Sequence, residues 1–172
     1  MELTEYLNSL FDKEGRRTLR SMLRAILEND PEKPHRIVWV GDGANGKTIL
    51  LHFVRETFKL FGHGQLIQYS KLSRSQLPYP PIIKEAHALV TEGSPEVLQE
   101  LLRSPTLKVR RLYENKEDIP NSFYILHICT EVPTSLQEAW ILRFPHHFIS
   151  HAPFLPQLLP LREEFYHWIM KE

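Results

Sequence analysis

The stretch that decides the fold is Gly41-Asp42-Gly43-Ala44-Asn45-Gly46-Lys47-Thr48. It matches the pattern Gly-x-x-x-x-Gly-Lys-Thr in full, after an apolar run at residues 36–40 and before a helical pattern at residues 47–61. Glycines let the backbone curl so that successive N–H groups point into one concavity, and the helix adds the positive end of its dipole. We therefore predict a phosphate-binding loop. An ordinary tight turn between strand and helix is the alternative.

This loop predicts ATP and Mg²⁺ as the cofactors, bound by all eight residues of the stretch. We expect Lys47 to reach the β- and γ-phosphates and the Thr48 hydroxyl to hold Mg²⁺. Hydrolysis also requires an acidic group that positions water or metal. Glu92 ends the apolar run at residues 87–91, so we predict it as the catalytic carboxylate and as a further Mg²⁺ ligand, with Glu96 as the alternative.

Strand-like and helix-like patterns alternate along the chain. Strands are expected at residues 36–40, 66–69, 87–91, 107–113, 123–130 and 144–149, and helices at 47–61, 95–102 and 161–170. Two more helices, broken near Gly15, precede residue 31, and Ser135 with Glu138 fits a capping box. The alternation predicts an α/β fold with a mostly parallel sheet between helices. We expect residues 1–30 to form a small helical segment packed on a P-loop ATPase domain, AAA+-like, at 31–172.

Composition limits the kind of protein this chain can be. Its 172 residues hold 21 Lys and Arg against 21 Asp and Glu, which excludes an electrostatic grip spread over the whole surface but allows a local basic channel. The single cysteine, Cys129, cannot form an internal disulfide. The sequence has no apolar run of the roughly 18–20 residues that span a bilayer, and it begins without a secretion signal. We expect a cytosolic or nuclear protein with no membrane partner.

Four motifs in register resemble superfamily 3 helicases, the AAA+-related motors of DNA viruses and plasmids. Asn45 stands before Gly46-Lys47 in the loop, and the resemblance extends from about residue 5 to the helix around Trp168. Three further segments carry the resemblance: the first is similar to the poxvirus-type primase-helicase branch, and the other two resemble the sensor strand and a later block of the family. They are Thr91-Glu92-Gly93-Ser94-Pro95-Glu96 followed by Lys108-Val109-Arg110-Arg111-Leu112-Tyr113, then Cys129-Thr130-Glu131-Val132-Pro133, then Glu138-Ala139-Trp140 through Phe148.

The resemblance implies roles for residues outside the loop. Glu92 becomes the hydrolytic carboxylate, and Thr130 with Glu131 ends a sensor strand beside the γ-phosphate. A hairpin with a charged turn at residues 114–118 would project into the pore of a ring and contact the phosphates of a single strand. The residues implied in that contact are Lys108, Arg110, Arg111 and Lys116. A solvated strand face is the alternative for the two arginines.

Two departures from the family pattern concern hydrolysis. Glu131 stands where the family carries an asparagine, and Ile141 and Leu142 stand where it carries arginines. Only Arg143 remains as a finger that would act across a subunit boundary. ATP binding is therefore a firmer expectation than fast hydrolysis.

The function implied is an ATP-dependent translocase or helicase of viral or plasmid replication type, working in the host cell. It would act on single-stranded DNA, with RNA not excluded, as a homo-oligomeric ring that we expect to be hexameric. A primase or an origin-binding protein is a further candidate partner. One alternative is an ATP-binding regulatory or assembly subunit with a weakened active site. The other is a small-molecule P-loop kinase, although the chain has no obvious arginine-rich lid.

Overall fold

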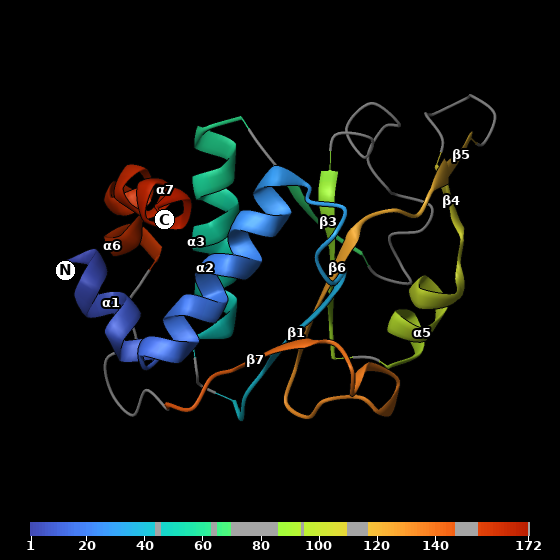
Figure 1. Cartoon of the computed structure of the whole chain (residues 1–172), viewed down its shortest axis with the longest axis horizontal. Coiled ribbons are helices and arrows are strands. Elements are labelled where there is room, and N and C mark those ends of the chain that lie inside the picture. Colours follow the sequence, from blue (N-terminus) through green and yellow to red (C-terminus); the bar gives the residue numbers. More distant parts are fainter. Residues whose placement is uncertain are drawn as a thin grey trace.

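The computed structural model describes residues 1–43, 46–62, 65–69, 86–93, 95–109, 117–146 and 155–171. A five-stranded sheet forms the centre of this part of the chain (Figure 1). Its strands are β1 (Arg36–Val40), β2 (Gln65–Gln68), β3 (Ala86–Glu92), β6 (Tyr124–Cys129) and β7 (Trp140–Arg143). Their order is β2-β3-β6-β1-β7, and every neighbouring pair is parallel, which confirms the predicted α/β fold. All five carboxyl ends therefore lie along one edge of the sheet.

Helices and a hairpin cover the two faces of the sheet (Figure 1). One face packs against α1 (Leu3–Leu10), α2 (Lys13–Glu28), α3 (Lys47–Leu60), α6 (Leu155–Leu158) and α7 (Arg162–Met170). The other face packs against α5 (Pro95–Arg103) and the antiparallel pair β4 (Thr106–Val109) and β5 (Glu117–Pro120). Short 3-10 turns at Thr134–Leu136 and Leu159–Leu161 complete the described elements.

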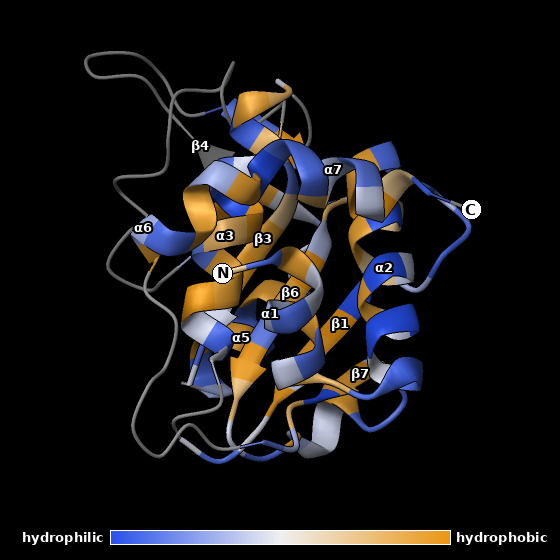
Figure 2. Cartoon of the chain, turned by 90° about the vertical axis from the view of Figure 1, so that its left-hand side faces the viewer, coloured by the Kyte–Doolittle hydropathy of each residue, from blue (hydrophilic) through white to orange (hydrophobic). Residues whose placement is uncertain are grey.

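Side chains that alternate along each central strand divide the core in two. On β1, Ile37 and Trp39 join the larger cluster under α2, α3 and α7, whereas Val38 and Val40 join the cluster under α5. Both clusters are buried, so these strands are apolar on both faces, as parallel sheets require. Figure 2 shows the apolar strands behind helices such as α2, which is largely hydrophilic on its outer side.

The break between the first two helices lies at Phe11 and Asp12, so the prediction of a break near Gly15 was wrong. Asp12 caps α2 by accepting a hydrogen bond from the backbone N–H of Gly15 at 2.8 Å. Gly15 lies in the first turn of α2, where a Cβ would come within 2.8 Å of the Phe11 Cβ. The glycine therefore makes room for a buried aromatic ring and does not end a helix.

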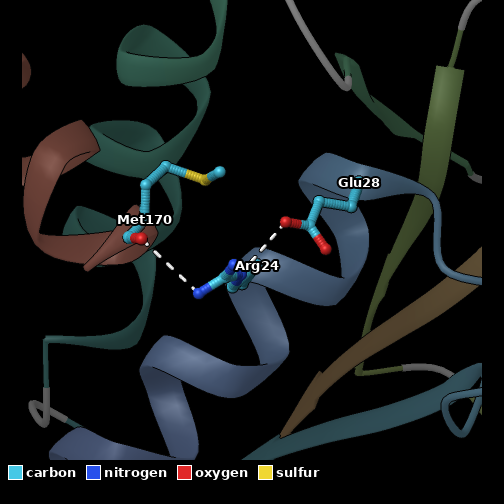
Figure 3. Close-up of polar contacts among 3 residues, drawn as sticks. All are labelled: Arg24, Glu28 and Met170. Atoms are coloured by element: carbon cyan, nitrogen blue, oxygen red, sulfur yellow. Dashed lines mark hydrogen bonds and ion pairs between the residues drawn. The ribbon is translucent and has the colours of Figure 1, made fainter. Parts of the chain in front are cut away.

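Two arginines of α2 fasten the last helix to the core. Arg20 donates to the Trp168 carbonyl at 2.9 Å and stacks over the Trp168 ring at 4.4 Å from its centroid. One turn on, Arg24 donates to the Met170 carbonyl at 3.4 Å and forms an ion pair with Glu28 at 3.0 Å (Figure 3). Cations at these carbonyls also complement the negative end of the α7 dipole.

Three local predictions near the hairpin and the last strand were wrong. The last described strand is β7, and residues 144–146, expected to begin a strand at 144–149, are not in a strand, whereas residues 147–149 lie outside the described residues. The Phe144 N–H still donates to the Val40 carbonyl at 2.9 Å, and its ring is buried against Phe11 and Trp39, at centroid distances of 4.8 and 5.7 Å. The strand β4 pairs with β5, which occupies part of the turn expected at residues 114–118. The 3-10 turn Thr134–Leu136 follows Pro133 and has no side-chain cap, so the capping box expected at Ser135 and Glu138 is not formed.

Across the described residues, no helix is long and apolar enough to cross a membrane.

Candidate functional site

The predicted phosphate loop lies between the buried strand β1 and the helix α3, at the carboxyl edge of the sheet. Gly43 and Gly46 adopt left-handed φ angles of 59° and 83°, which glycine reaches at no steric cost. Gly46 is the N-cap of α3 and offers no side chain to its first N–H groups. These donors therefore remain available to an anion. Ala44 and Asn45, also predicted to bind nucleotide, lie outside the described residues.

Lys47 is folded back onto this loop. Its side chain is 8% exposed, and its Nζ donates to the carbonyls of Gly41 at 2.5 Å and of Gly43 at 3.5 Å. Burial lowers the pKa of Lys47, and the nearby Asp42 carboxylate opposes that shift. Hydrogen bonds between two charged groups are stronger than those to neutral carbonyls, so a phosphate anion would compete effectively for the Lys47 ammonium.

Three strand ends meet beside the loop. The strand β6 lies between β1 and β3, and backbone bonds tie the ends together: Gly41 N–H donates to the Cys129 carbonyl at 3.2 Å, and Gly93 N–H donates to the Ile128 carbonyl at 3.1 Å. Gly93 needs its left-handed φ of 71° for this turn. The arrangement places Glu92 directly across β6 from the loop.

The strand ends and the loop enclose a cleft with a volume of about 760 Å³. Five of the predicted site residues line it, namely Gly43, Lys47, Glu92, Thr130 and Glu131. The last three of these are exposed at its surface. Thr48 in the first turn of α3 is also exposed, but it is not among the residues that line the cleft. A hydroxyl and carboxylates beside a loop that fits phosphates are ligands that suit Mg²⁺ held together with a nucleotide. Glu96, the alternative to Glu92, does not line this cleft.

Arg55 on α3 is a cationic neighbour of Glu92 that the sequence did not reveal. Its Nη2 donates to the Gln68 side chain at 3.0 Å, while its Nε is buried without a partner among the described residues. Burial lowers the pKa of Arg55, and the charge of Glu92 opposes that shift. Arg55 therefore places a positive charge near the predicted catalytic carboxylate.

A buried polar pair lies beneath the cleft. The Thr91 hydroxyl and His127 Nδ1 are 2.7 Å apart, and both side chains are almost completely buried. His127 also lines the cleft, and its Nε2 has no hydrogen-bond partner in the described chain. Burial lowers the pKa of His127, so its ring is neutral near pH 7. Because His127 stands inside an apolar run, the sequence did not indicate that it would line the cleft.

Other predicted residues lie away from the cleft. Arg143 ends β7 opposite Val40 and is exposed, but it is not among the residues that line the cleft. For Lys108 the position on β4 is described, while its side chain is not. Arg110, Arg111 and Lys116 lie outside the described residues.

Comparisons with known proteins find likeness in structure only. No protein-family model matches the chain, and no curated protein matches it. An apo structure of the NrS-1 C-terminal region has a TM-score of 0.65 at 13% identity, covering 98% of this chain and 44% of that one. A second apo structure of this region has a TM-score of 0.63 at 13% identity, covering 96% of this chain and 43% of that one. A JCV helicase structure with a bound thiazolopyridine compound has a TM-score of 0.49 at 17% identity, covering 95% of this chain and 49% of that one.

The chain thus shares its fold with the NrS-1 C-terminal region and spans less than half of that structure's length. At this identity the likeness concerns the fold alone. Membership of superfamily 3 and of its poxvirus-type branch stays a prediction.

Proposed function

We propose that the chain is the ATPase core of a nucleic-acid translocase of the helicase class, acting on single-stranded DNA, with RNA as an alternative strand. The observation that carries this proposal is the cleft at the carboxyl edge of the sheet. Its residues Lys47, Glu92 and Thr130 come from three separate segments, yet all line one space beside a loop that fits phosphates. The helicase-type motif order and the fold support the proposal.

In this proposal the phosphates of ATP take the place of the carbonyl groups that now hold Lys47. The Lys47 ammonium moves from Gly41 and Gly43 to the β- and γ-phosphates, and the free N–H groups of α3 bind the same anion. The exposed Thr48 hydroxyl and Glu92 would hold Mg²⁺, which supplies charge neutralisation when bound. Glu92 would also position the attacking water, with the positive charge of Arg55 nearby.

We propose that the hairpin β4–β5 contacts the single-stranded nucleic acid. It lies on the α5 side of the sheet, away from α2 and α7 (Figure 1). Lys108 on β4 is the described position that we assign to a phosphate contact, together with Arg110, Arg111 and Lys116. Subunits would assemble as a ring, expected to be hexameric, with Arg143 reaching the neighbouring cleft. A primase or an origin-binding protein would bring the ring to DNA.

One observation favours a second candidate, an ATP-binding regulatory or assembly subunit. Glu131 lines the cleft as an exposed carboxylate, where a negative charge opposes the negative γ-phosphate. Arg143 does not line the cleft of its own subunit. Such a subunit would bind ATP and turn it over too slowly to drive movement.

Turnover of ATP with and without single-stranded DNA separates the two candidates. We expect stimulation by DNA in the wild type and its loss in Lys47→Ala, whose cleft lacks the phosphate contact. Lys59→Ala is the matched control, because Lys59 is an exposed lysine at the far end of α3. ATP binding without any turnover would assign the chain to the regulatory candidate, and turnover that Lys47→Ala leaves unchanged would overturn both.

A further inference from the structure

A second cleft lies at the opposite, amino-terminal edge of the sheet, at the base of the β4–β5 hairpin. Its volume is about 380 Å³, and it is lined by residues just before β4, just after β5 and at the start of β1. The two ends of the hairpin are joined there by the backbone N–H of Asn121, which donates to the Pro105 carbonyl at 2.9 Å. None of the residues predicted to bind the nucleotide or the single-stranded nucleic acid lines this cleft.

The charge of this cleft is one-sided. Arg36, the first residue of β1, and Arg103, the last residue of α5, both line it, and no aspartate or glutamate does so among the described residues. Both arginines are exposed, and no hydrogen bond or ion pair joins either guanidinium group to another described residue. In a chain of zero net charge, two guanidinium groups in one concave site form a local positive potential.

The end of α5 does not require Arg103 as a cap. Asn121 already performs that role, because its Nδ2 donates to the carbonyls of Leu101 at 3.0 Å and of Ser104 at 2.8 Å. The Arg103 guanidinium therefore remains available to a ligand. The Asn121 Oδ1 is buried without a hydrogen-bond partner in the described chain, which leaves an acceptor at a residue that lines the cleft.

We propose that this cleft binds a phosphate of a single-stranded nucleic acid, held by Arg36 and Arg103 as the strand passes the base of the hairpin. Guanidinium groups match phosphate oxygens with two parallel hydrogen bonds, and such contacts do not depend on base sequence. The inference rests on the proposed function, and it extends the strand contact from the hairpin to the body of the domain.

The test is equilibrium binding of a fluorescent oligothymidine strand, followed by anisotropy at several salt concentrations. In the double variant Arg36→Ala with Arg103→Ala we expect binding to weaken by roughly 10- to 30-fold near 0.1 M salt. The slope of log K against log salt should fall by about 1.4, since each lost contact on a single strand contributes about 0.7. The matched control is Lys13→Ala with Arg17→Ala, which removes the same charge from the exposed face of α2.

The outcomes separate this inference from the proposed function. A loss confined to the cleft variant, with unchanged thermal unfolding and unchanged ATP binding, supports the cleft. Equal losses in cleft and control variants would show a general charge effect and overturn it, as would no loss in either. Displacement of the strand by submillimolar thymidine monophosphate would assign the cleft to a free nucleotide and also overturn it. If the wild type binds no strand at all, the nucleic-acid part of the proposed function fails, and this inference fails with it.

Discussion

Replacing Lys47 with methionine should separate the stability of the empty protein from its affinity for ATP. The lysine is 8% exposed, and its ammonium group donates to the loop carbonyls of Gly41 and Gly43. Methionine is apolar and of similar length, so the substitution removes a buried ammonium group. Burial already lowers the pKa of this group in the wild type. Such replacements are often neutral or stabilising. We therefore expect the free energy of unfolding of the empty variant to stay within about 1 kcal/mol of the wild-type value.

The response to ATP should change much more. ATP at one hundred times its Kd stabilises a folded chain by about 2.7 kcal/mol. For this size of chain that corresponds to a rise in Tm of roughly 5–11 °C. Losing a hydrogen bond to a charged partner costs about 2 kcal/mol, which weakens binding roughly 30-fold. At the same ATP concentration the variant should then gain only about 0.9 kcal/mol, or roughly 2–4 °C.

The assay is thermal unfolding with and without Mg-ATP, with Lys59→Met as the matched control. Lys59 lies on the same helix, is exposed, and pairs with Glu56 at 3.4 Å. The control should keep the full wild-type shift. A Lys47→Met protein that also keeps the full shift would refute the reasoning, because the lysine would then have no part in binding phosphate.

Three further predictions concern stability and pH. Phe144→Ala should lower the free energy of unfolding by about 3–5 kcal/mol in denaturant titration, because it empties a buried aromatic site; a loss under 1 kcal/mol would contradict the packing described. Arg20→Ala should cost about 1–3 kcal/mol by the same assay through its lost carbonyl bond and ring contact, whereas the exposed Arg17→Ala should cost almost nothing. Because burial lowers the pKa of His127, the unfolded chain binds more protons below about pH 6.5, and stability should fall there by up to about 1.4 kcal/mol per pH unit. In unfolding titrations from pH 7 to 5, His127→Gln should flatten this fall and the exposed His167→Gln should not; equal slopes in all three proteins would exclude His127 as its source.

The positions of the predicted phosphate loop and of Glu92 at strand ends could be read from the sequence because their signals are local. The loop is one contiguous motif between an apolar strand and a helix, and Glu92 ends the next long apolar run. The meeting of these segments with Thr130 depends on strand order, since β6 inserts between β1 and β3. Residue patterns along the chain do not contain that order, and here it came only from the family resemblance.

The missed features depend on contacts between distant segments. The buried His127 is paired with Thr91, 36 residues earlier, and the charge of Glu92 at the end of β3 acts on Arg55 in α3. Strand β5 carries Glu117 and Asp118, which have low strand propensity, and it forms through its pairing with β4. Phe144 belongs to an apolar pattern typical of a strand, yet β7 ends at Arg143 and the Phe144 ring packs against Phe11, 133 residues earlier. Tertiary packing decided each of these cases.

The most direct measurement of the central claim is a single-turnover experiment on Glu92→Gln beside Glu96→Gln. Each variant is loaded with labelled Mg-ATP in the presence of single-stranded DNA, and bound and hydrolysed nucleotide are counted per chain. Glu92 lines the cleft opposite the loop, and Glu96 does not. We predict that Glu92→Gln binds ATP as tightly as the wild type and hydrolyses it at least 100-fold more slowly, about the scale of a lost catalytic base, whereas Glu96→Gln hydrolyses it normally. Normal hydrolysis by Glu92→Gln would contradict the account.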